Sequence, residues 1–278
     1  MMTTRTTKLV FLHCLSATLL LLSACDNATS QKNSTAGNIT FQPYFNDTAI
    51  SCSSAISHSN KHWSYTQLQF FISNIELKNG AGQWQQALLE HSPYQTKQAA
   101  LLGEQCYADQ KSNNKANWVL QLDSNSKLNE ATDIRFTLGL PFAINHLNPL
   151  TQESPLNIPS MFWSWQIGHK FLRLEMVTKD DTWLYHLGSI GCSASSPMRS
   201  PEQECRYPNR YEFELPLNKQ HKLLKFELAS LLNNVTLSAH TSCQSSPDSF
   251  SCQTLMSNLN LRDENSVFHS QITENTHE

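Results

Sequence analysis

The chain of 278 residues is poor in charged side chains, which make up 15% of it, and its lysines and arginines form no cluster. Binding to nucleic acid requires a concentrated positive surface, so we expect no nucleic-acid partner. The sequence also lacks the Gly-x-Ser-x-Gly, phosphate-loop, dinucleotide-binding and His-Glu-x-x-His motifs. These patterns carry the catalytic machinery of several large enzyme classes, and their absence predicts a protein that is not an enzyme.

Long hydrophobic runs are equally scarce. The single apolar run, residues 9–22, follows two basic residues and leads into Leu22-Ser23-Ala24-Cys25. It is shorter than the roughly 20 residues that span a bilayer and has the pattern of a secretory signal peptide. The Leu-Ser-Ala-Cys box resembles the bacterial lipobox, whose cysteine is acylated and becomes the first mature residue. The alternative is an ordinary signal peptide that happens to end near a cysteine.

We therefore expect residues 1–24 to be removed and Cys25 to carry lipid such as palmitate. The mature protein would be periplasmic and anchored to the bacterial membrane through this lipid. Asp26 slightly favours the inner membrane, by resemblance to known sorting rules. Residues 25–38 are polar and predict a flexible tether.

The cysteines that remain predict disulfides. An even number in an oxidising compartment favours pairing, and no Cys-x-x-Cys or paired zinc-type spacing is present, which argues against a thioredoxin-like or zinc-thiolate site. Proximity in the sequence favours Cys192 with Cys205 and Cys243 with Cys252, leaving Cys52 with Cys106, although other pairings remain open.

Alternating hydrophobic residues predict an all-β fold. Pro43 suggests that the first strand, near residues 39–43, lies at a sheet edge. Further strands are expected at residues 68–72, 134–140, 171–177, 183–187, 211–215, 224–228 and 235–239. Residues 79–82 predict a hairpin turn, residues 229–233 a helical turn, and residues 90–117 mainly loop. We expect one antiparallel β-sandwich-like domain with long loops over residues 39–263, followed by a polar tail at 264–278.

Three motifs stand in the second half of the chain. They are Gly-x-Pro-Phe-x-x-Asn-His-x-x-Pro at residues 139–149, Met-Phe-Trp-x-Trp at 161–165, and His-Leu-Gly-Ser-x-Gly-Cys at 186–192. In this order they resemble the metallo-mystery pair four-cysteine family, the MbnP-like periplasmic copper-binding proteins. The resemblance covers most of the mature chain, over residues 41–261.

This resemblance implies a copper site. Its ligands would be His146 and His186, and the copper would be held as cuprous ion. Trp163 or Trp165 would lie nearby and be oxidised to kynurenine by a MauG-like di-haem c-type cytochrome peroxidase. The four-cysteine motif would map onto Cys192, Cys205, Cys243 and Cys252. Imidazole is a suitable copper ligand, which agrees with this interpretation.

The chain departs from the family pattern at three positions. Asn148 replaces the usual Asp and is expected to orient His146 less strongly. His169 replaces a Tyr and offers a possible third ligand, and Gln244 replaces a Met.

Two other functions remain open at this point. One is an interaction lipoprotein without metal, which binds a sugar or protein through the aromatic loop. The other is a zinc enzyme that uses His146, His186 and His169. Glu175, Glu212 and Glu214 fall in strand patterns and are expected to face solvent, and His58 and His62 are expected to be solvated.

Overall fold

Most of the described chain is extended. The structure, a computed structural model, describes residues 37–106, 115–164, 166–196 and 198–271. The predicted signal peptide, Cys25 and all but the last two residues of the predicted tether lie outside the described residues, as does Trp165. Among the described residues, no helix combines the length and the hydrophobicity needed to cross a bilayer.

The larger sheet is built around one long central strand. Its order is β13 (Thr182–Leu187), β12 (Leu172–Val177), β4 (Lys61–Asn79), β6 (Ala99–Gln105) and β7 (Lys115–Asn117). Along β4 it also takes up β3 (Ile56–His58), β5 (Trp84–Gln86) and β9 (Ala131–Leu138), and β14 (Tyr211–Pro216) pairs with β9. All of these pairings are antiparallel, as predicted.

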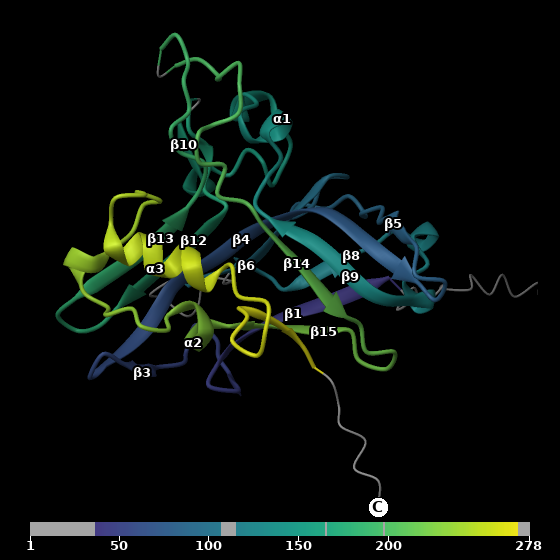
Figure 1. Ribbon diagram of the computed structural model, residues 1–278, viewed down its shortest axis with the longest axis horizontal. Helices are drawn as coiled ribbons and strands as arrows, with labels where there is room; N and C mark the ends of the chain where they lie inside the picture. Colours follow the sequence, from purple (N-terminus) through teal and green to yellow (C-terminus); the bar gives the residue numbers. More distant parts are fainter. Residues whose placement is uncertain (1–36, 107–114, 165, 197, 272–278) are drawn as a thin grey trace, which may run out of the picture. The chain divides into compact units, whose positions relative to one another are not determined.

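The smaller sheet joins both ends of the described chain (Figure 1). It contains β16 (Phe268–Ser270), β15 (Leu223–Glu227), β1 (Asn38–Phe45) and β2 (Thr48–Ala49), with β8 (Val119–Gln121) also on β1. The prediction of β1 as an edge strand is wrong, because β15 covers one side of it and β8 and β2 share the other. Pro43 is tolerated because it falls between the stretches that pair with β8 and with β2.

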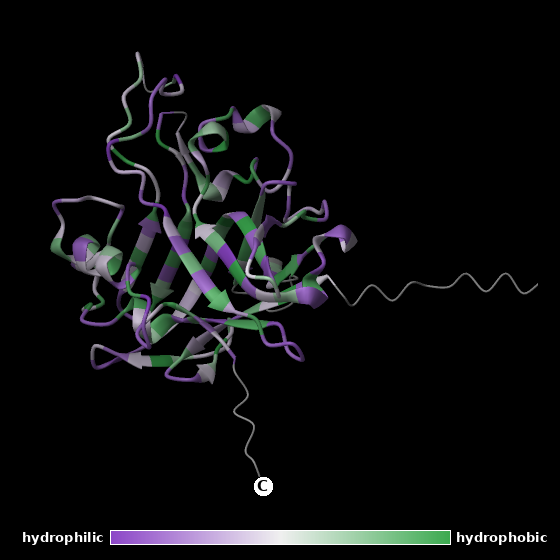
Figure 2. Cartoon of the chain, turned by 45° about the vertical axis from the view of Figure 1, so that its right-hand side comes forward, coloured by the Kyte–Doolittle hydropathy of each residue, from purple (hydrophilic) through white to green (hydrophobic). Residues whose placement is uncertain are grey.

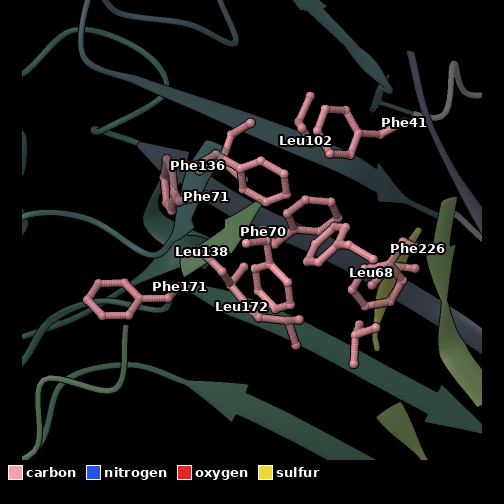
Figure 3. Packing of buried hydrophobic residues seen from close by; sticks show 14 of the residues in the cluster. Phe41, Leu68, Phe70, Phe71, Leu102, Phe136, Leu138, Phe171, Leu172 and Phe226 are labelled. Atoms are coloured by element: carbon pink, nitrogen blue, oxygen red, sulfur yellow. The ribbon is translucent and has the colours of Figure 1, made fainter. Parts of the chain in front are cut away.

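Phenylalanines from the two sheets meet in the core (Figure 3). The ring centroids of Phe70 on β4 and Phe226 on β15 lie 5.3 Å apart, and those of Phe136 on β9 and Phe268 on β16 lie 5.1 Å apart. All four side chains are completely buried. Each contributes on the order of 1.5–3 kcal/mol through the removal of apolar surface from water. The all-β, sandwich-like prediction is therefore confirmed.

The three disulfides confirm the predicted pairing: Cys52–Cys106, Cys192–Cys205 and Cys243–Cys252. Cys243 and Cys252 belong to the hydrophobic core, and Cys52 and Cys106 pack against it.

Several predicted elements need correction. Residues 90–117 were expected to be mainly loop, but the described part of this segment contains β6, which lies between β4 and β7 with residues 99–104 buried. Residues 235–239 form no strand, although Val235 and Leu237 are buried. A helix that was not predicted, α3 (Phe250–Asn258), follows them. The tail is ordered further than expected, since β16 pairs with β15 and buries Phe268.

The proline-rich segment leaves the larger sheet after β9. It forms the short helix α1 (Phe142–Asn145), 3-10 turns at Pro149–Thr151 and Pro159–Met161, and then the two-stranded hairpin of β10 (Phe162–Ser164) and β11 (Gly168–His169). Figure 1 shows α1 and β10 at the same end of the larger sheet, and Figure 2 shows hydrophobic and hydrophilic residues mixed in these loops. All three sequence motifs have residues in or next to this region.

Candidate functional site

Trp163 lies at the centre of the candidate site. Its half-buried indole ring has its centroid 6.3 Å from that of the His186 imidazole. The ammonium group of Lys170 lies 5.7 Å from the same indole. A Cβ atom at Gly188 would come within 2.6 Å of Trp163 Cζ3, so only glycine leaves room for this indole. The second and third motifs thus meet in one cluster.

His186 is held in place by the neighbouring strand. It lies on β13 opposite Arg173 of β12, and its Nε2 is 2.9 Å from Glu175 Oε1. The hydrogen bond with His186 is the main cause that lowers the pKa of Glu175 to about 2. Because an ionised carboxylate only accepts hydrogen bonds, Nε2–H is the donor, and in the neutral ring Nδ1 keeps its lone pair.

The imidazole of His186 is favoured in its neutral form. Burial is the main cause that lowers its pKa, although the hydrogen bond to Glu175 acts in the opposite direction. Neutral imidazole is the form that binds metal ions. Glu175 lies on the partly exposed face of β12, as predicted, but its carboxylate is engaged there, because it also accepts a hydrogen bond of 2.7 Å from Arg173 Nε. Glu212 and Glu214, in contrast, are exposed as expected.

Two cations fasten the tryptophan loop to the sheet. Lys170 Nζ and Arg173 Nη1 both donate hydrogen bonds to the carbonyl oxygen of Ser160, at 2.9 and 3.0 Å. Burial is the main cause that lowers the pKa of Lys170 to about 8. Arg173 of β12 therefore helps to hold the loop that carries Trp163, and Glu175 of the same strand orients His186.

His146 lies at a different part of the site. It follows α1, is buried, and packs its ring against Phe142 with 4.9 Å between centroids. Its Nε2 lies 3.2 Å from Asn145 Nδ2 and 3.5 Å from Cys205 Sγ. Within the described part of the chain, no hydrogen bond or ring contact joins His146 directly to His186.

Asn145 connects His146 to the tryptophan hairpin. Its side-chain oxygen accepts a hydrogen bond from the His169 backbone N–H at 2.8 Å. A Cβ atom at Gly168 would come within 2.6 Å of this side chain, so the hairpin packs tightly on it. Among the described side chains, Asn145 is thus a neighbour that can orient His146. Asn148, which we expected in that role, instead accepts a hydrogen bond from the backbone N–H of Leu150.

His169 does not fit a ligand role. It is completely buried, and its Nδ1 and Nε2 lie 2.9 and 2.8 Å from the carbonyl oxygens of Asn145 and Leu156. Both ring nitrogens therefore face backbone acceptors. His169 thus links the loops that carry Asn145 and Leu156. The zinc-enzyme alternative, which needs His169 as a third ligand, gains no support from this geometry.

Sequence reasoning missed Glu175, Arg173, Lys170 and Asn145. For Glu175 and Arg173 a signal existed, because the two predicted strands at residues 171–177 and 183–187, paired as a hairpin, place these residues opposite or diagonal to His186. Asn145 is a fixed position of the first motif, but the motif gave it no role. No comparable signal marks Lys170, since its contacts depend on how the loops fold back.

The fold and the cluster together define a disulfide-stapled β-sandwich protein with a buried histidine–tryptophan site. The MbnP family model matches residues 34–245, and the chain belongs to that family. Among solved structures, MbnP from Methylosinus trichosporium has a similar fold, with a TM-score of 0.66 and 18% sequence identity. This similarity covers 79% of the present chain and 86% of that chain. A search of the curated proteins finds no match.

Proposed function

We propose that this protein binds copper, held as cuprous ion, and serves copper handling in the periplasm. His146 and His186 would supply the ligands. The observation that carries the proposal is the buried, neutral His186 beside Trp163, in a chain of the MbnP family. In this role the protein would be a binding protein and not an enzyme.

The donor chemistry suits cuprous ion. A soft monovalent ion is held well by a few neutral donors in a site that excludes water, and imidazole is among the ligands that copper accepts. His146 and His186 are only 6% and 8% exposed. Glu175 would act on the site indirectly, because its hydrogen bond to Nε2 orients the ring and leaves Nδ1 to bind the metal.

We further propose that Trp163, or Trp165 two positions later in the sequence, is oxidised to kynurenine. A di-haem c-type cytochrome peroxidase of the MauG-like class would be the partner and would supply the oxidising equivalents. Support comes from the position of Trp163, which is half-buried and in contact with the proposed ligand His186. The modification would place a new polar group beside the copper ligand.

The proposed location is the periplasmic face of a bacterial membrane, with lipid on Cys25. This agrees with the three disulfides, which form in oxidising compartments.

Cuprous titration against a chromophoric chelator tests the ligand assignment. We expect His186→Ala and His146→Ala each to lose tight copper binding while the disulfides remain intact. His62→Ala is the matched control, because His62 is exposed and bonded only to Ser57 among described side chains, and it should bind as the parent protein does. Unchanged copper binding in both site variants would refute the ligand assignment, whereas a parent protein that binds no copper would favour the interaction lipoprotein without metal.

A further inference from the structure

The disulfide Cys192–Cys205 touches a proposed copper ligand. The Nε2 atom of His146 lies 3.5 Å from Cys205 Sγ, and the ligand atoms of His146, Cys192 and Cys205 all lie within 4.8 Å of one another. Metal bonds of about 2.0–2.3 Å to nitrogen and sulfur, as in zinc sites, place neighbouring donors about 3.5–4 Å apart. The nitrogen and one sulfur therefore already stand at the separation that a shared metal requires.

The loop closed by this disulfide is fastened to the site at two further points. Ser200 Oγ donates a hydrogen bond of 2.6 Å to the carbonyl oxygen of His146. Gln166 Nε2 donates one of 3.0 Å to the carbonyl oxygen of Cys192. These bonds do not depend on the S–S bond, so they would keep the sulfurs near His146 after it breaks.

This disulfide also differs from the other two in its surroundings. Cys243 and Cys252 lie within the hydrophobic core and Cys52 and Cys106 pack against it, whereas Cys192 and Cys205 do neither. Cys205 is nevertheless buried, at 4% exposure, in the vicinity of the equally buried His146. Opening this bond would thus leave the packed core in place.

We propose that Cys192, Cys205 and His146 form a second, reduction-dependent site for cuprous ion. A dithiol reductant would pass two electrons and two protons to the disulfide, breaking the S–S bond and forming two thiols, while the reductant becomes a disulfide. Cuprous ion would then displace both thiol protons without changing its own oxidation state. The site shares His146 with the proposed function but does not need His186.

Cuprous ion fits this donor set better than zinc does. Thiolate sulfur is a soft ligand that selects cuprous ion, and three donors suffice for it. Structural zinc sites almost always take four protein ligands. Among the described residues, the group contains only these three donors.

The test uses the His186→Ala protein, in which the disulfide-intact form is expected to have lost its copper. The protein is reduced anaerobically with a phosphine, the free thiols are located by differential alkylation, and cuprous ion is titrated against a chelator. We expect reduction to restore a bound cuprous ion with thiolate-to-copper absorption in the ultraviolet. Adding Cys192→Ser and Cys205→Ser to His186→Ala should remove it, although the other two cysteine pairs are still present.

Two controls keep the result interpretable. Alkylation of the reduced His186→Ala protein before copper is added blocks the thiols without further substitution, in case the serine variant fails to fold. Failure of the proposed function would appear separately, as copper binding by the disulfide-intact parent that does not depend on His186. The proposal is overturned if reduction restores no copper, if the regained copper survives the serine substitutions, or if zinc displaces cuprous ion from the reduced protein.

Discussion

At the residue scale, the site depends on contacts made across strands and loops. Glu175 sits in an alternating strand pattern typical of solvent-facing positions, yet in the structure it binds both His186 and Arg173. A single sequence shows the period of a strand but not what covers its polar face. His146, His186 and Trp163 were found only because they lie in motifs that resemble a family.

Gly188→Ala tests how tightly the tryptophan is positioned. The added Cβ would lie 2.6 Å from the Trp163 ring and 2.8 Å from the His169 carbonyl oxygen, so the indole must move. We expect a loss of about 1–3 kcal/mol in the free energy of unfolding, as for overpacked cores. Chemical denaturation measures this loss, and it should come with weaker copper binding. Gly80→Ala is the control, because nothing lies within 4 Å of its Cβ position.

The lowered pKa of Lys170 predicts that the free energy of unfolding depends on pH. Its pKa is lowered from 10.5 to about 8 by burial, so the unfolded chain binds more protons between these values. The stability contributed by this residue therefore rises as the pH increases from about 8 to 10.5. Thermal unfolding of the metal-free protein across this range should show the rise, and the rise should shrink in Lys170→Met. An identical pH profile in both proteins would contradict the assignment.

At the scale of elements, the sequence predicts strands well where one face is buried. The strands near residues 134–140, 171–177, 183–187 and 211–215 were all found, because polar and apolar residues alternate there. Alternation does not predict β6, because its Ala-Ala-Leu-Leu stretch is buried on both faces and shows no period of two. Alternation does not predict β16 either, because only three residues pair with β15 and they lie within a mostly polar segment.

The contribution of β16 to stability is testable through the buried side chain of Phe268. Phe268 is completely buried among five other phenylalanine rings. Phe268→Ala should lower the free energy of unfolding by about 3–5 kcal/mol, because it leaves a cavity between the sheets. Phe250→Ala, at a side chain that is 79% exposed on α3, is the matched control and should change stability little. If both substitutions change the free energy of unfolding by the same small amount in chemical denaturation, β16 does not stabilise the core.

At the scale of the whole molecule, the proposed membrane anchor rests on the signal-peptide pattern of residues 1–24 and on Cys25. Cys25→Ser should release the protein from the membrane fraction and abolish incorporation of labelled palmitate in a producing bacterium. If the variant stays in the membrane fraction, the lipid anchor is not at Cys25.

The central claim is a copper site beside a tryptophan that a partner oxidises. The most direct measurement is metal analysis with peptide mass spectrometry on protein produced together with an active di-haem peroxidase. We expect one bound copper per chain and the mass change of tryptophan to kynurenine, the loss of one carbon and gain of one oxygen, in the peptide that contains Trp163 and Trp165. An unmodified peptide and no copper, with the partner demonstrably active, would contradict the central claim.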